Sequence, residues 1–152
     1  MVLIYKFKKE KLLDGSYKAR PRIHILLRGS KTSIEVPALI DTGCDTTVIP
    51  EGIAKAIGLD MNGKKNTLYG FKESSDVIQS KIDITFLGRV ERESEILNNI
   101  PALILLSKDE ESKDEEDVVL GIDGIFDFFE VTFKKSVNKI ILKKDSRFIN
   151  SS

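Results

Sequence analysis

Much of this chain alternates apolar and polar residues with a period of two, a pattern typical of β-strands. The first two strands are predicted where every second residue is apolar, at Leu3, Tyr5 and Phe7 and at Ile23, Ile25 and Leu27. Asp14-Gly15 lies between them and marks a turn. On the second strand, Arg22 and His24 alternate with the apolar residues and are expected on the solvent face. The N-terminal part therefore predicts strands with one face toward a core.

A nearly continuous apolar run, Ile34 to Ile40, predicts a buried strand. We expect an irregularity at Pro37, because proline has no N–H to donate to a neighbouring strand. Farther along, Pro50 can begin a short helix with Ile53 and Ile57 on its inner face, and Gly58 can end it. This region therefore predicts a strand, a turn and one short helix.

The second half of the chain continues the β pattern. Residues 66–87 predict a hairpin with its turn at 70–75, and Asp117 to Gly121 is an apolar strand that ends in glycine. Ile125 and Phe128 follow at helical spacing, and two more alternating strands come after them. The fold class expected from the pattern is mainly β, with one or two short helices.

Composition narrows the picture. A length of 152 residues suits a single domain over 1–152. Lys+Arg and Asp+Glu are equal at 24 each, and the basic residues of 1–40 alternate with apolar ones, so no nucleic-acid partner is expected. One cysteine excludes an internal disulfide and suits a reducing compartment. The apolar start, Met1 to Ile4, is too short for a signal peptide or a membrane span. We therefore expect a soluble, cytoplasmic protein with no membrane partner.

Ser-Lys-Asp-Glu-Glu occurs twice in tandem, at 107–111 and 112–116. Such a segment cannot bury apolar surface, so 107–117 is expected to be a solvated acidic loop. Calcium binding is not expected there, because no glycine shapes a binding loop.

The main candidate for chemistry is Asp41-Thr42-Gly43, which directly follows the apolar run and precedes more apolar residues, Val48 and Ile49. We therefore expect this turn to stay in the interior. A buried carboxylate is costly unless it is used or neutralised. Aspartic peptidases use one, since their paired Asp residues share a proton and activate water. The plain alternative is a strand followed by an ordinary turn, with Gly43 supplying positive φ.

Two segments together carry a resemblance to a known family. Ala-Leu-Ile-Asp-Thr-Gly-Cys-Asp at 38–45, and Val-Val-Leu-Gly-Ile-Asp-Gly-Ile-Phe-Asp-Phe-Phe-Glu-Val-Thr-Phe at 118–133, resemble single-lobed aspartic peptidases of the retropepsin type. The match covers roughly 20–143 and implies a closed β-barrel lobe. Retroviral members place a basic residue where this chain has Ile122, and it pairs with the acid matched here by Asp45. The local ion pairs must therefore differ.

The resemblance implies an aspartic endopeptidase that hydrolyses peptide bonds in peptide or protein substrates. One chain supplies one such Asp, so two chains must meet as a homodimer, each contributing Asp41. By resemblance, Thr42 braces the pair and Gly43 permits close backbone approach. No cofactor or metal is expected, because His24 is the only histidine and Cys44 the only cysteine. Cys44 is expected to be a small buried filler.

The hairpin at 66–87 stands where retropepsins carry a mobile flap over the cleft. Tyr69, Gly70 and Phe71 are then the candidate substrate-binding residues. The alternative is an ordinary β-hairpin. The rival function is a retropepsin-like dimerisation or peptide-binding module that does not cleave.

Overall fold

The structure is a computed structural model that describes residues 2–69, 74–90, 93–108, 117–145 and 147. The strands are β1 (Val2–Lys6), β2 (Lys8–Lys11), β3 (Tyr17–Arg20), β4 (Arg22–Arg28), β5 (Ser33–Ile40), β6 (Thr47–Pro50), β7 (Lys65–Tyr69), β8 (Ser74–Phe86), β9 (Glu95–Leu105), β10 (Val118–Leu120), β11 (Phe129–Lys134) and β12 (Lys139–Lys144). The helical elements are α1 (Glu51–Ile57) and the short 3₁₀ turn η3 (Lys135–Val137). The chain is mainly β, as the pattern predicts.

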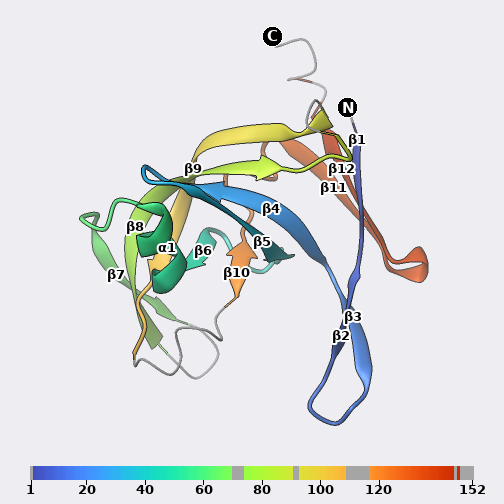
Figure 1. The fold of residues 1–152 in the computed structure, drawn as a ribbon, viewed down its shortest axis with the longest axis horizontal. Helices are drawn as coiled ribbons and strands as arrows, with labels where there is room; N and C mark the ends of the chain where they lie inside the picture. The colour runs from blue at the N-terminus through green and yellow to red at the C-terminus, as the bar shows by residue number, and fades with distance from the viewer. Residues whose placement is uncertain (1, 70–73, 91–92, 109–116, 146, 148–152) are drawn as a thin grey trace.

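The largest sheet has the order β4-β5-β10-β6-β9-β8-β7, and β8 also pairs with β4, so that strand pairing runs around the core and returns to its start (Figure 1). A second sheet has the order β1-β12-β11, and β2 and β3 form a two-stranded sheet of their own. The core is built from aliphatic residues together with Phe86 and Phe129. Its largest fully buried side chains are Phe86, Ile23, Ile25, Leu27, Ile49, Ile57, Ile82, Ile84, Ile104, Leu120, Ile140 and Leu142.

The alternation of apolar residues correctly predicted which face of β4 is buried. Ile23, Ile25 and Leu27 are buried, and they alternate with exposed or half-buried polar and apolar residues. The irregularity expected at Pro37 is wrong, because β5 pairs with β4 in continuous register, with Pro37 opposite His24. The first three residues of β5, from Ser33 to Glu35, are exposed, so the apolar run that begins at Ile34 is not buried throughout.

The helix α1 begins and ends where the sequence indicates. Pro50 precedes its first turn, and Gly58 closes it in the left-handed conformation, with φ of 82°. A side chain is disfavoured in that conformation, which is the reason for glycine there. Ala54 and Ile57 are the buried residues of α1. No described helix is both long enough and apolar enough to cross a membrane.

A second helix after β10 is absent from the described residues, since 123–128 form consecutive hydrogen-bonded turns. The N–H groups of Phe126 and Phe129 donate to the carbonyl oxygens of Ile122 and Ile125. Ile125 and Phe129 point into the core from these turns. The helical spacing therefore corresponds to successive turns, which bury Ile125 without forming a regular helix.

Two similar pentapeptides, Val36 to Ile40 and Ile100 to Ile104, occupy related places in the sheet. The first lies in β5, which pairs in parallel with β10, and the second lies in β9, which pairs in parallel with β6. Since β6 follows β5 and β10 follows β9, each copy pairs with the strand that follows the other copy. This crossed pairing brings the ends of β5 and β10 together.

Candidate functional site

Asp41 follows directly after β5 and is fixed by backbone hydrogen bonds. Its N–H donates to the carbonyl oxygen of Leu120 in β10 (3.0 Å), and its carbonyl accepts the N–H of Cys44 (3.2 Å). Its carboxylate oxygen Oδ1 accepts the N–H of Gly43 (2.9 Å). The side chain is thus oriented by its own turn, while the carboxylate keeps capacity for another partner.

The turn lies at the surface of the single chain, which corrects the expectation of an interior position. Asp41 is half-buried, and Thr42 and Gly43 are exposed. The chain returns to the core only in β6, where Val48 and Ile49 are buried. Apolar residues on both sides of the turn therefore bury their own strands and not the turn between them. In one chain, Asp41 is therefore partly accessible to solvent.

The turn after β10 locks against the Asp41 loop. The N–H of Gly121 donates to Thr47 Oγ1 (3.1 Å), and a Cβ at Gly121 would lie 2.5 Å from the carbonyl carbon of Thr46. The N–H groups of Ile122 and Asp123 donate to the carbonyls of Cys44 (2.9 Å) and Asp45 (2.8 Å). The second motif therefore holds the Asp41 loop in place through close backbone contact.

Thr47 is a residue that sequence reasoning missed. It is fully buried and is the buried polar residue of the described core. Its hydroxyl oxygen accepts a hydrogen bond from the Gly121 N–H. This N–H is buried and needs an acceptor within the protein. The sequence feature that could have indicated Thr47 is its place directly before the apolar residues Val48 and Ile49.

Cys44 is half-buried, and its thiol donates to the carbonyl of Thr46 (3.0 Å). Burial raises the pKa of the Cys44 thiol, and the nearby carboxylates of Asp41 and Asp45 raise it further. A neutral thiol is a poor nucleophile, so this environment fits a packing role. Among the described residues, no ion pair is formed by the Asp45 carboxylate.

The predicted hairpin is present as β7 and β8, with Tyr69 opposite Ser74. Tyr69 is 81% exposed, so it packs on little of its own chain. Gly70 and Phe71 lie outside the described residues. A hollow of about 660 Å³ is lined by residues of β8 and β9 and of the segment before β7, among them Gln79, Pro101 and Lys64, and by Thr46. Asp41 does not line this hollow.

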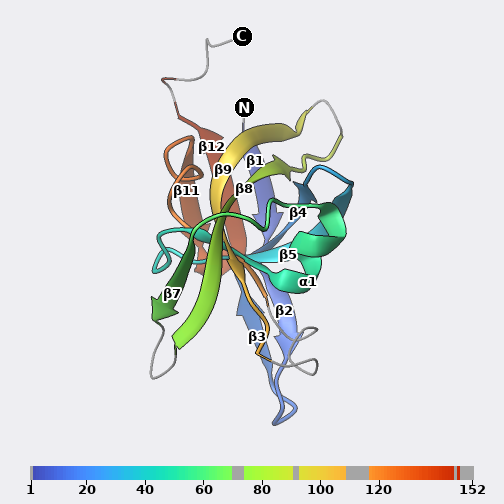
Figure 2. The same ribbon diagram turned by 90° about the vertical axis from the view of Figure 1, so that its left-hand side faces the viewer.

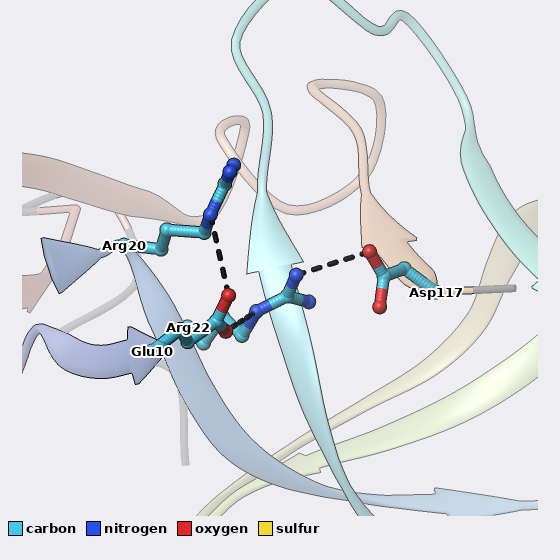
Figure 3. A network of polar contacts seen from close by, with 4 residues as sticks. All are labelled: Glu10, Arg20, Arg22 and Asp117. Carbon is cyan, nitrogen blue, oxygen red and sulfur yellow. Dashed lines mark hydrogen bonds and ion pairs between the residues drawn. The ribbon is translucent and has the colours of Figure 1, made fainter. Parts of the chain in front are cut away.

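Arg22 forms a polar network that the sequence pattern did not predict (Figure 3). Its Nη2 contacts Asp117 Oδ2 (3.0 Å), and its Nε donates to Glu10, which also pairs with Arg20 (3.2 Å). The Arg22 side chain is only 11% exposed, so its assignment to the solvent face was wrong. Asp117 immediately precedes β10. The network therefore lies at the start of the strand whose Leu120 carbonyl accepts the Asp41 N–H.

His24 lies on the exposed face of β4, with Nδ1 3.5 Å from Glu35 Oε1. It is remote in sequence from Cys44, and the structure pairs it with Pro37 of β5. Within the described ranges, no group of three His, Cys, Asp or Glu residues could hold a metal ion.

No protein-family model matches the sequence, and no curated protein matches it. Many solved structures resemble the fold, among them two proteases. A retropepsin-like aspartic protease from Rickettsia conorii matches with a TM-score of 0.55 and 15% identity, over 93% of this chain and 91% of that chain. EIAV protease complexed with the inhibitor HBY-793 matches with a TM-score of 0.46 and 19% identity, over 72% of this chain and 88% of that chain.

The likeness to the Rickettsia structure extends over nearly the whole of both chains. This protein therefore has a retropepsin-like fold, as the two sequence segments indicated. At such low identity the likeness concerns the fold alone, and the residues of the site must be argued from their own geometry.

Proposed function

We propose that this protein is an aspartic endopeptidase that works as a homodimer, with one Asp41 from each chain activating water. The observation that carries the proposal is the Asp41 turn itself. On a retropepsin-like fold, the Asp41 N–H donates to the Leu120 carbonyl and fixes the backbone of this half-buried residue. The Gly43 N–H donates to Asp41 Oδ1 and orients the carboxylate.

The exposed turn supports a dimeric site. A single Asp41 cannot provide both a base and an acid, so a second carboxyl group is needed. Thr42 and Gly43 are exposed beside Asp41, so a second copy can approach the turn without displacing its own chain's core. A two-fold axis at this place would bring the two Asp41 carboxyl groups together.

The chemistry follows from the pairing. Two carboxylates a few ångströms apart repel, so the pair holds one proton between them. The ionised Asp41 takes a proton from water as the water oxygen attacks the peptide carbonyl carbon. The protonated Asp41 donates to the carbonyl oxygen, which becomes a hydroxyl of the tetrahedral intermediate. In the collapse, the Asp41 that took the water proton gives it to the leaving nitrogen as the C–N bond breaks. The other Asp41 takes a proton from a hydroxyl of the intermediate, which leaves a carboxylic acid product and restores the starting pair.

The remaining site residues have supporting roles in the proposal. Thr42 braces the two turns across the axis, and Gly43 supplies the N–H that orients Asp41 Oδ1. Tyr69, with Gly70 and Phe71, closes over an extended peptide that pairs as a strand. The exposure of Tyr69 supports a role toward a ligand, since the side chain has little to pack on in its own chain. The single cysteine fits the cytoplasmic location that belongs to this proposal.

The rival proposal is a module of the same fold that binds peptide or dimerises without hydrolysis. The two proposals differ in one measurement, the cleavage of a denatured protein by the purified chain. We expect cleavage by the wild type, and a loss on the order of a thousandfold or more in Asp41→Asn, because an amide cannot act as the base.

Asp123→Asn is the matched control, because this exposed aspartate lies in the adjoining turn and only its backbone N–H contacts the Asp41 loop. It should cleave at nearly the wild-type rate. Equal activity of wild type and Asp41→Asn would reject Asp41 as the base. A wild type that binds peptide but leaves it intact would establish the module instead.

A further inference from the structure

The β2–β3 ribbon stands clear of the rest of the fold (Figures 1 and 2). Its register runs from Lys8 opposite Arg20 to Lys11 opposite Tyr17, and Gly15 turns the chain with φ of 87°. A two-stranded ribbon without further packing is only marginally stable in water. A protruding ribbon of this kind therefore needs either an anchor or a partner.

The anchor is the network at its base (Figure 3). Glu10 of β2 pairs with Arg20 of β3 and with Arg22 of β4, and Arg22 continues to Asp117. A charged group as buried as Arg22 is costly unless it is paired, and both of its partners are in place. These ion pairs thus fix the orientation of the ribbon relative to β4 at its root, the end where it joins the rest of the fold.

That root lies beside the Asp41 turn. The N–H of Ile40, the residue before Asp41, donates to the carbonyl of Pro21 (3.0 Å) between β3 and β4. Asp117 leads into β10, whose Leu120 carbonyl accepts the Asp41 N–H. In Figure 1 the arrowhead of β5, which ends one residue before Asp41, points toward the side on which the ribbon leaves the body.

The far end of the ribbon carries apolar side chains that its own chain does not cover. Leu13 is fully exposed and Tyr17 is 59% exposed. Lys9 Nζ lies 4.9 Å from the centre of the Tyr17 ring, which leaves the other face of the ring open. This arrangement offers a small apolar contact bordered by lysines.

We propose that the β2–β3 ribbon is an arm that packs on a second copy of this chain, with Leu13 and Tyr17 as its contact residues. The inference rests on the proposed function, which places a two-fold axis beside Asp41. If two Asp41 side chains meet there, the surface of the partner begins at the root of the arm. An arm of Lys8 to Arg20 reaches roughly 20 Å at about 3.3 Å per residue, so it extends over the partner.

The test uses thiol labelling of the full chain in a Cys44→Ser background that sedimentation shows to dimerise as the wild type does. Leu13→Cys reports on the arm, and Val90→Cys, an exposed residue of the β8–β9 connection, is the control. The rate of reaction with a maleimide is measured as protein concentration is raised through the dimer dissociation constant. We expect the Leu13→Cys rate to fall about tenfold or more, and the Val90→Cys rate to stay constant.

A second measurement removes the contact. Leu13→Asp and Tyr17→Asp should each raise the dimer dissociation constant by about tenfold or more, because each places a charge in an apolar contact. The melting temperature of the dilute monomer should not change, because both side chains are exposed in the single chain. A clear drop in the melting temperature of the dilute monomer in both variants would show that Leu13 and Tyr17 pack on their own chain. That result would overturn the inference.

The other outcomes separate the arm from the active site. One outcome is a dimer that cleaves peptide, in which the Leu13→Cys reaction rate does not fall on dimerisation and Leu13→Asp leaves the dissociation constant unchanged. It would overturn the inference about the arm and leave the proposed function standing. Binding of a single-stranded RNA homopolymer that Lys9→Gln weakens, with dimerisation unchanged, would make the arm a polyanion-binding element instead. A wild type that is monomeric at every concentration would overturn both proposals.

Discussion

Among single residues, Asp41 and Gly121 show how backbone contacts create a candidate site. Asp41 takes its orientation from N–H and carbonyl groups of Leu120, Gly43 and Cys44, and no described side chain holds its carboxylate. Gly121 allows the strand that supplies Leu120 to approach the Asp41 loop closely. Both roles depend on the main chain and on small residues.

Gly121→Ala should therefore destabilise the protein. Its Cβ would lie 2.5 Å from the Thr46 carbonyl carbon and 2.8 Å from the Thr46 nitrogen and oxygen, so the backbone must move. We expect a loss of about 1–3 kcal/mol in the free energy of unfolding, together with reduced peptide cleavage. Urea denaturation measures the first quantity. Gly52→Ala is the control, because a Cβ there meets nothing within 4 Å in α1, and it should be neutral or stabilising.

The raised pKa of the Cys44 thiol gives a prediction with a definite sign. Below the ordinary thiol pKa of about 8.5, the thiol is neutral in both the folded and the unfolded chain. Above it the unfolded chain ionises first, so folding stability falls as pH rises through the raised pKa. Wild type should lose stability relative to Cys44→Ala between pH values of about 8 and 10. Urea denaturation in the presence of a reductant measures this difference, and parallel pH profiles would contradict it.

Among the elements, the β7–β8 hairpin carries Tyr69, the described residue of the proposed flap. It is paired in regular register up to Tyr69 opposite Ser74, so its strands are scaffold. Tyr69 itself contributes little to that scaffold because it is exposed. A side chain of this kind is free to serve a ligand.

Tyr69→Gly should lower turnover of a peptide several-fold or more, while the melting temperature changes little. The reason is that a hairpin closing over substrate excludes water from the reaction, and the exposed ring adds little to folding. Lys65→Gly, at another exposed position of β7, controls for the effect of glycine on the strand. If the two variants have the same kcat/KM, Tyr69 belongs to the scaffold.

For the whole molecule, the decisive question is whether two Asp41 side chains meet. In such a dimer the carboxyl pair is favourable while it holds a proton, and becomes repulsive when both groups are ionised. Dimerisation of the wild type should therefore weaken from mildly acid to neutral pH. Asp41→Asn carries no charge there, so its dimer should be tighter than the wild type at neutral pH.

Sedimentation equilibrium of both proteins at several pH values measures this dependence. Asp123→Asn should follow the wild type, since its carboxylate is in the adjoining turn and not on the proposed axis. Dissociation constants that run parallel for wild type and Asp41→Asn would show that the two carboxyl groups do not meet, and the proposed active site would then be abandoned.

Local chemistry was enough to predict most elements. Alternating apolar residues identified β4, β8 and the β11–β12 pair, because a strand exposes its two faces alternately. Pro50 and Gly58 marked the bounds of α1 through their own backbone preferences. The two segments 38–45 and 118–133 together indicated the retropepsin-like fold that the structural comparison shows.

Tertiary structure decided what depends on residues far apart in the chain. The pairing of β10 between β5 and β6 sets the Asp41 turn at the surface, although apolar residues flank it on both sides. The Arg22 side chain is only 11% exposed, and Glu10 and Asp117 reach it from other elements, which a period of two within β4 cannot encode. The sequence by itself thus determined which segments are strands and which residues could do chemistry. Burial, partners and the direction of the β2–β3 ribbon came from long-range pairing, because those quantities belong to pairs of segments and not to any one segment.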